Sequence, residues 1–180
     1  EIKIKSNILD HLNALKEKKL SKSFPDRKIN SIYFDTHDLD YFKDGEEGTT
    51  PRIKVRYRWY GDLFSTESKK KGSLEFKFRK NVYGFKKNFK VKDLNINTNC
   101  EWKDIKRKIT NSLPPEYKIL FKFNSEKILI NRYKREYFIS KNKKIRITLD
   151  KNIQIYDQRF ALKKPNLKLK NYTQNYLVVE

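Results

Sequence analysis

Basic and apolar residues alternate along one stretch of the chain, from Arg52 to Tyr60, which reads Arg-Ile-Lys-Val-Arg-Tyr-Arg-Trp-Tyr. Side chains of a β-strand point to alternate faces, so this spacing predicts a strand with Lys54, Arg56 and Arg58 on one face, in line with Arg52. Like charges stacked on one face repel unless water screens them or an anion lies among them. Two interpretations stay open for this stretch alone: an ordinary strand with a solvated basic face, and one wall of a site for a polyanion.

A second predicted strand carries both signs of charge on one face. It covers residues 73–79, and Glu75 shares its face with Lys77 while apolar side chains occupy the other face. A carboxylate flanked by cations suits a site that holds phosphate together with a divalent cation. A further basic patch, Lys86 and Lys87, follows along the chain.

Other predicted strands repeat the division between a charged and an apolar face. Their central charged residues are Lys3, Arg135 and Arg146. If the sheet closes on itself, the charged faces line an interior and the apolar faces pack under the helices. Unpaired charges taken out of water cost several kcal/mol each, so this interior has to stay wet or hold a polyanion. Arginines would then grip phosphate oxygens through two hydrogen bonds, and lysines would act as point charges.

The composition also indicates an anionic partner. The chain has 180 residues, with 43 Lys+Arg against 22 Asp+Glu and a formal net charge of +21. Such an excess favours nucleic acid, a membrane surface or a phosphorylated substrate as the partner. The chain is also rich in Lys, Asn and Ile together, a compositional bias that raises the charge without selection for binding. The placement of the cations therefore carries more weight than their total.

Several classes of site are excluded. The lone Cys100 rules out an internal disulfide framework, and no Cys-x-x-Cys pair or His/Cys cluster indicates zinc. His11 and His37 are too far apart in sequence to suggest a metal pair. No apolar run approaches the roughly 18 residues of a membrane helix, and the sequence pattern predicts no signal peptide. The first residue is not methionine and lies inside a predicted strand, so we expect an excised domain or a trimmed fragment.

Strands outnumber helices in the predicted element order. We expect strands at residues 1–5, 30–36, 52–60, 73–79, 128–139, 144–150, 153–155, 167–169 and 176–180. We expect helices at residues 8–15, 100–111 and 116–121, a short helix or turn at 38–43, a loop at 44–50 and a turn at Pro25-Asp26. In the second of these helices, Trp102, Ile105 and Ile109 form a core-facing stripe. With no linker or internal repeat, residues 1–180 are predicted to form one domain of the α+β class.

Five segments resemble, in order, the motifs of one family. Residues 30–39 look like the motif SIYFDTPDL, with His37 where proline is usual, and residues 54–62 resemble the family's basic strand. The last three segments follow in the same order: residues 74–77, 133–138 and 145–150. Over its whole length the chain is similar to the VTC domain of polyphosphate polymerases, within the triphosphate tunnel (CYTH-like) superfamily.

This resemblance implies an antiparallel, barrel-like β-tunnel with basic walls and a few flanking helices. It implies metal-dependent transfer of the terminal phosphoryl group of ATP to a polyphosphate chain, so the expected partners are ATP, triphosphate and polyphosphate, and nucleic acid is not expected. The implied phosphate-binding residues are Lys3, Arg56, Arg58, Lys77, Lys86 or Lys87, Arg135 and Arg146. The implied catalytic residues are Arg56, Arg58, Lys77, Arg135 and Glu180. The implied ligands of Mn²⁺ or Mg²⁺ are Glu180, Glu75 and Glu1.

The chain departs from the family pattern at both ends. The superfamily's opening ExExK pattern is present only as Glu1-Ile-Lys3, and the helix that follows the last strand in the family lies beyond Glu180. By analogy with the family, we expect a cytoplasmic protein, held at the cytoplasmic face of a membrane by a further segment, domain or partner.

Two other functions stay open on the residues alone. A triphosphatase or nucleotide cyclase on the same tunnel would release orthophosphate or a cyclic nucleotide instead of making polyphosphate. A non-enzymatic binder of polyphosphate or nucleic acid would need no chemistry, and Tyr57, Trp59 and Tyr60 could stack bases. The alternation argues against stacking, because Tyr57 and Trp59 fall on the face opposite the arginines.

Overall fold

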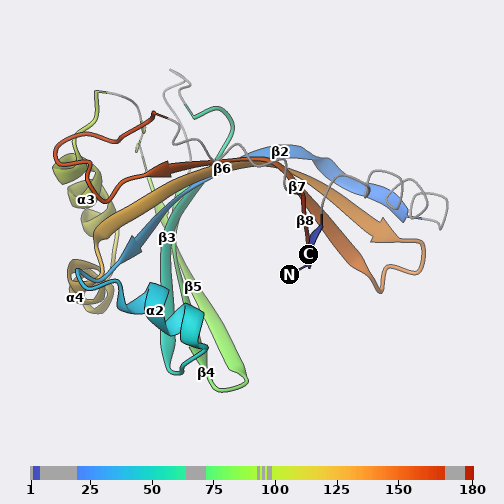
Figure 1. Cartoon of the computed structure of the whole chain (residues 1–180), viewed down its shortest axis with the longest axis horizontal. Helices are drawn as coiled ribbons and strands as arrows, with labels where there is room; N and C mark the ends of the chain where they lie inside the picture. Colours follow the sequence, from blue (N-terminus) through green and yellow to red (C-terminus); the bar gives the residue numbers. More distant parts are fainter. Residues whose placement is uncertain are drawn as a thin grey trace.

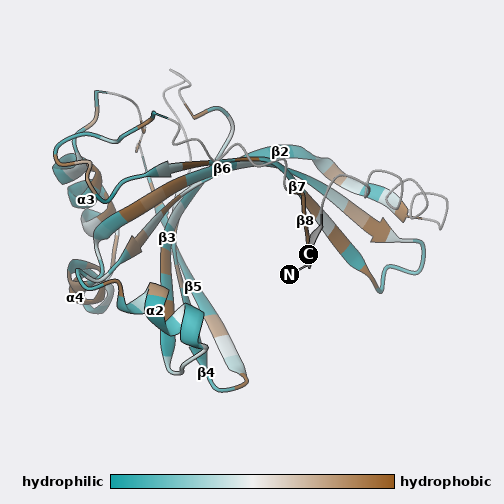
Figure 2. Cartoon of the chain, viewed as in Figure 1, coloured by the Kyte–Doolittle hydropathy of each residue, from teal (hydrophilic) through white to brown (hydrophobic). Residues whose placement is uncertain are grey.

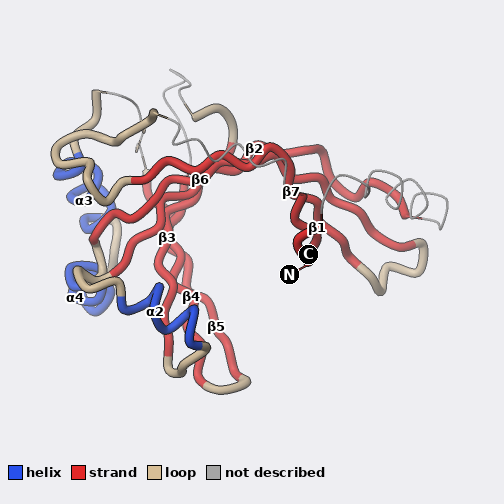
Figure 3. The backbone as a smooth tube through the Cα atoms, viewed as in Figure 1, coloured by secondary structure: helices blue, strands red, loops and turns tan. Residues whose placement is uncertain are grey.

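The computed structural model describes residues 2–4, 20–63, 72–92, 94, 96, 99–168 and 177–180, and of residues 2–4 it describes the backbone. Strands dominate this part of the chain (Figure 1 and Figure 3). The strands are β1 (Ile2–Ile4), β2 (Leu20–Asp35), β3 (Arg52–Tyr60), β4 (Gly72–Lys80), β5 (Tyr83–Val91), β6 (Glu126–Ser140), β7 (Arg146–Asp157) and β8 (Leu177–Val179). The helices are α2 (Asp40–Glu47), α3 (Trp102–Asn111) and α4 (Pro115–Phe123).

The described strands form one sheet in the order β1-β8-β7-β6-β2-β3-β4-β5. Each neighbouring pair is antiparallel. The long strands β2 and β6 pair along most of their length and form the top of an arch (Figure 1). From them, β3, β4 and β5 descend on one side, while β7 runs alongside β6 and carries β8 and β1 at the other side (Figure 1). The sheet therefore has a concave face between its two sides.

The sheet is open within the described residues. Its edges are β5 and β1, and no described pairing joins them. On the β1 side the strands are short, since β8 and β1 have 3 residues each and β7 pairs β8 at two positions, Leu149 and Asp150. The predicted mostly antiparallel sheet with a few helices is confirmed, but these strands do not confirm a closed tunnel.

The hydrophobic core lies on the other face of the sheet, under α3 and α4. On β3, Val55, Tyr57 and Trp59 are at most 1% exposed and belong to the same cluster as Ile105 and Ile109 of α3. The predicted core-facing stripe of this helix is confirmed. Figure 2 shows apolar and polar residues alternating in colour along the strands. Because the apolar side chains of β3 are buried under the helices, its cations must point to the concave face.

The structure corrects the predicted turn at Pro25-Asp26, which lies inside β2. The pairing of β2 with β6 shifts register between Lys22 and Phe24 and again between Phe24 and Arg27. Proline cannot donate to a strand ladder, so it is tolerated at irregularities and at edges. Strand β3 pairs β2 only from residue 29 to residue 34, so β2 has no partner on that side at Pro25 within the described strands.

Other boundaries also differ from the predictions. The predicted loop 44–50 starts inside α2, which continues to Glu47. The two short strands predicted around residue 150 form the single strand β7, and β5 was not predicted. Leu167 packs against the core without belonging to a strand, and the predicted helix at residues 8–15 lies outside the described residues.

We predict that Gly72→Ala destabilises the fold. A Cβ at Gly72 would overlap the buried ring and hydroxyl of Tyr57. Forcing extra volume into a packed core costs about 1–3 kcal/mol. Gly84→Ala is the matched control on the next strand, since its added Cβ would lie 3.5 Å from the Phe78 carbonyl oxygen, an ordinary contact. Chemical denaturation of both variants gives the comparison, and equal free energies of unfolding would contradict the packing at Gly72.

Candidate functional site

A cavity of about 430 Å³ lies on the concave face of the sheet. Side chains of five paired strands and the end of β8 surround it. The residues that line it are Tyr33 from β2, Lys54, Arg56 and Arg58 from β3, Glu75 and Lys77 from β4, Asn131, Tyr133 and Arg135 from β6, Asp150 and Ile153 from β7, and Val178 and Glu180 at β8. Five of these side chains are cationic and three are carboxylates, so the lining carries excess positive charge.

On one side of the cavity, a single carboxylate holds two arginines. Arg56 Nε donates to Glu75 Oε2 at 2.6 Å, and Arg58 Nη1 lies 3.9 Å from Glu75 Oε1. Glu75 is 6% exposed, and Arg56 also contacts the hydroxyl of Tyr33 at 3.4 Å. The strand register explains the contact, because Arg56 lies directly opposite Glu75. Glu75 therefore fixes the direction of both guanidinium groups while neutralising one of the two charges.

Across the cavity, Arg135 makes a bidentate pair with Asp150. Its Nε and Nη2 donate to the two Asp150 carboxylate oxygens at 2.6 Å and 2.7 Å, and Nη2 also donates to Glu180 Oε2 at 2.9 Å. Burial raises the pKa of Asp150, and the hydrogen bonds from Arg135 act in the opposite direction. The same hydrogen bonds raise the pKa of Arg135, so its guanidinium stays charged. Arg135 thus holds two carboxylates side by side at the cavity wall.

Tyr133 adds a neutral hydrogen-bond donor. Its ring lies under the guanidinium of Arg135, with 5.4 Å from Cζ to the ring centroid. Burial raises the pKa of the Tyr133 hydroxyl to about 12, against the opposing charges of Arg135 and Arg58. The hydroxyl therefore keeps its proton at neutral pH and remains able to donate it to an anion.

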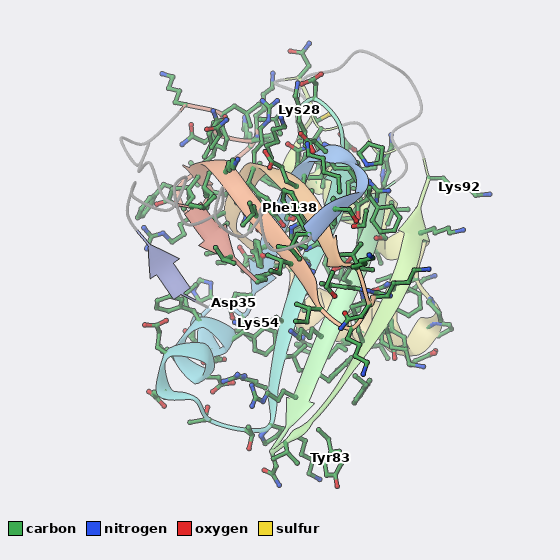
Figure 4. The ribbon with its side chains drawn as sticks, turned by 90° about the vertical axis from the view of Figure 1, so that its right-hand side faces the viewer. Lys28, Asp35, Lys54, Tyr83, Lys92 and Phe138 are labelled. Atoms are coloured by element: carbon green, nitrogen blue, oxygen red, sulfur yellow. The ribbon has the colours of Figure 1, made fainter. Side chains whose placement is uncertain are left out.

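Two lysines of the lining have no ion pair within the described residues. Lys54 lies directly opposite Lys77 in the sheet, and Lys77 lies directly opposite Lys86. Paired residues of antiparallel strands share a face, so the three lysines form a row across β3, β4 and β5. Figure 4 shows Lys54 near α2. The Asp35 carboxylate accepts hydrogen bonds from the backbone N–H groups of Tyr41 and Phe42 and so holds the first turn of this helix. This row leaves positive charge unneutralised.

Buried polar atoms without partners lie in another row on the same face, beyond the row of Arg56 and Glu75. Asn131, Ser31 and Arg58 are directly opposite one another on β6, β2 and β3. Asn131 Oδ1, Ser31 Oγ and Arg58 Nε are buried and have no hydrogen-bond partner in the described part of the protein. Unmet hydrogen bonds are costly in a buried site, and two of these residues, Arg58 and Asn131, line the cavity where a polar ligand would meet them.

The structure brings Arg56, Arg58, Lys77 and Arg135 to one cavity, as their strand phases predict, and it places Glu75 and Glu180 in the lining of the same cavity. It does not bring Arg146 there, because Arg146 is exposed at the start of β7, four residues before Asp150. Lys87 lies opposite the buried Phe76 and so faces the other side of the sheet from Lys86. Glu1 and the side chain of Lys3 lie outside the described residues.

Further polar residues of the lining were not among the site residues implied by the resemblance. The alternation of the basic strand already places Lys54 beside Arg56, and it places Tyr133 beside Arg135. Asp150 shares a predicted face with Arg146, but only the pairing of β6 with β7 shows that it meets Arg135. Nothing in the sequence marks Asn131 as a site residue, because only the structure shows that its Oδ1 atom is buried without a hydrogen-bond partner.

The carboxylates of the cavity lie in two places, each beside an arginine. In the described part of the chain, no group of three or more His, Cys, Asp or Glu residues could hold a metal ion. Asp150 and Glu180 lie together on Arg135, while Glu75 lies on Arg56 and Arg58. None of the described helices has the length and apolarity needed to span a bilayer.

We predict that Asp150→Asn destabilises the protein much more than a matched change on the surface. Arg135 is largely buried, and removing the charge of Asp150 takes away its main partner. Breaking a buried ion pair in this way costs about 3–5 kcal/mol. Asp104→Asn removes the partner of the exposed Arg107 on α3, and exposed pairs contribute about 0–1 kcal/mol. Denaturant unfolding measures both changes. Losses of similar size would show that the Arg135–Asp150 pair is not a structural support.

One known family of domains is similar to this chain. None of the curated proteins searched matches the chain. The family model of the VTC domain matches residues 2–180, which is essentially the whole chain, and this family is related to polyphosphate polymerases. The chain belongs to the VTC domain family.

Proposed function

We propose that this domain transfers the terminal phosphoryl group of ATP to a polyphosphate chain bound along its concave face. The family relationship supports a domain related to polyphosphate polymerases. The observation that carries the proposal is the cavity lined by five cations from three strands, opposite the hydrophobic core. A linear polyanion with several negative charges matches such a surface better than a compact neutral substrate does.

Two arginines of β3, Arg56 and Arg58, would hold successive phosphates of the bound chain. Arg56 and Arg58 lie two residues apart on one face, about 6.8 Å along the strand. Each guanidinium presents several N–H donors, and Glu75 occupies only part of them. Lys54 and Lys77 would add point charges beside the same phosphates. Glu75 would act as the positioning residue that keeps both arginines turned into the cavity.

A divalent cation would fit beside Glu180 and Asp150. Mg²⁺ and Mn²⁺ prefer oxygen ligands, and Mg²⁺ is commonly held by one or two carboxylates plus substrate phosphates and water. The two carboxylates held by Arg135 are such a set, and Glu180 is the more exposed of them. When bound, the ion would neutralise charge on the phosphate oxygens.

Transfer itself needs alignment and charge neutralisation more than covalent help from the protein. A terminal oxygen of the acceptor chain would attack the γ-phosphorus of ATP while the bond to the β,γ-bridging oxygen breaks and ADP leaves. Arg58 and Arg135 both line the cavity, and both would stabilise the negative charge on the reacting phosphate. The protonated Tyr133 hydroxyl would donate a further hydrogen bond to a phosphate oxygen.

Incubation of the protein with ATP and Mn²⁺ tests the proposed activity. We expect polyphosphate on a stained gel, with ADP as the coupled product. Released orthophosphate without polyphosphate would point to a triphosphatase, and a cyclic nucleotide would point to a cyclase. Binding of polyphosphate without turnover of ATP would identify a non-enzymatic binder.

We predict that Arg56→Ala weakens binding of triphosphate. The guanidinium contacts phosphate in the ground state and the transition state alike, and loss of a charge-assisted contact raises the Kd about tenfold or more. Arg107→Ala is the matched control, because Arg107 is an exposed arginine on α3, on the other face of the sheet. Calorimetric titration of triphosphate without metal compares the two variants. An equal loss of affinity in both would mean that net charge, and not the cavity, drives binding.

We predict the opposite pattern for Glu180→Gln. Glu180 is an anion on the cavity wall, so its neutralisation should leave metal-free binding of triphosphate unchanged or slightly tighter. Turnover that depends on Mn²⁺ should be lost, because the proposed ligand of the ion is gone. Titrations with and without Mn²⁺, together with ATP turnover, separate the two effects. Near-normal turnover in this variant would remove Glu180 from the metal site.

A further inference from the structure

Arg27 on β2 lies among three aromatic rings beside the cavity. Its guanidinium carbon is 5.7 Å from the ring centroid of Phe24, 5.6 Å from that of Tyr60 and 5.6 Å from that of Tyr137. Phe24 and Tyr137 also contact each other edge to face, with 5.8 Å between centroids. The rings hold the guanidinium by cation–π attraction, which orders a long side chain that would otherwise move freely in solvent.

Strand geometry places this cluster at one end of the cavity. Tyr60 follows Arg58 by two residues on β3, and Tyr137 follows Arg135 by two residues on β6, so both rings share the face of the cavity arginines. Arg27 itself lies directly opposite Arg135 in the pairing of β2 with β6. The row of cations in the cavity therefore continues past its lining to Arg27.

Arg135 has carboxylate partners, whereas Arg27 has none among the described residues. Like charges directly opposite each other in a sheet are unfavourable, and Arg135 is neutralised by Asp150 and Glu180. Arg27 has no ion pair within the described residues, and its neighbour Asp26 is bound by Lys22 and Lys134. Aromatic rings attract the cation without cancelling its charge or occupying its N–H donors. Arg27 is thus an exposed, ordered cation with free donors.

We propose that Arg27 is an outer phosphate-binding residue, which contacts inorganic polyphosphate chains longer than triphosphate as they leave the cavity. This role rests on the proposed function of the cavity, which would hold the inner phosphates. The rings of Phe24, Tyr60 and Tyr137 serve to orient Arg27. Their faces toward the cluster centre are taken by the guanidinium, so the geometry favours recognition of phosphate over stacking of a nucleobase.

Titration of the full chain with triphosphate, ATP and long-chain polyphosphate, all without metal, tests the proposal. Arg27→Ala should leave the Kd for triphosphate and for ATP unchanged and raise the Kd for long-chain polyphosphate about three- to tenfold, the range for the loss of one hydrogen-bonded contact that water partly replaces. Arg27→Lys keeps the charge but loses the planar fork of donors, so it should give a smaller increase. Lys28→Ala is the matched control, because Lys28 is the next residue of β2 and pairs with Asp62. Unfolding curves of each variant establish that the fold is kept.

Each other outcome overturns the proposal in a different way. Equal losses for triphosphate and long polyphosphate would place Arg27 in the inner site, and a loss confined to ATP would make the cluster a nucleobase site. If Arg27→Ala and Lys28→Ala raised the Kd for long-chain polyphosphate equally, the increase would come from the lost net charge and not from a contact made by Arg27. If the unchanged protein binds neither triphosphate nor polyphosphate, the proposed function of the cavity fails. If it binds both and Arg27→Ala changes nothing, only the outer site fails.

Discussion

The site depends on one constraint, the burial of the apolar side of β3. Val55, Tyr57 and Trp59 pack under the helices, and a strand cannot bury one face without presenting the other. Arg56 and Arg58 are therefore directed into the concave face by the same contacts that stabilise the core. A slip of one residue in this strand would expose the apolar side chains and bury the arginines, so the core also fixes the register of the site.

The cations of the cavity are tolerated because acids neutralise some of them and leave others free. Glu75 holds Arg56 and Arg58 of β3, and Asp150 with Glu180 holds Arg135. Lys54 and Lys77 have no ion pair among the described residues. Ion pairs at the walls order the guanidinium groups, and the uncompensated lysines keep the cavity attractive to an anion. The cavity wall therefore has both ordered guanidinium groups and a net positive charge, and both properties favour binding of a chain of phosphates.

Much of this arrangement follows from the sequence, because it follows from period-two alternation. The strand of residues 52–60 matches β3 in both bounds, and Arg135 faces the cavity, as its place on the charged face of a predicted strand indicates. Partners across strands are harder to predict, since they depend on register. The sequence does not show that Lys86 rather than Lys87 joins the lysine row, or that Asp150 meets Arg135. The predicted turn at Pro25-Asp26 was wrong because proline usually marks a turn, whereas Pro25 lies at a register shift within β2.

The central claim is that the concave face is a site for a linear chain of phosphates. Thermal unfolding in the presence of triphosphate, polyphosphate or single-stranded DNA tests it most directly. The account predicts that the unfolding temperature rises with the concentration of triphosphate and of polyphosphate, because each binds the folded state alone, and that added salt reduces the rise. Stabilisation by single-stranded DNA without stabilisation by triphosphate would contradict the account and identify a nucleic-acid surface instead.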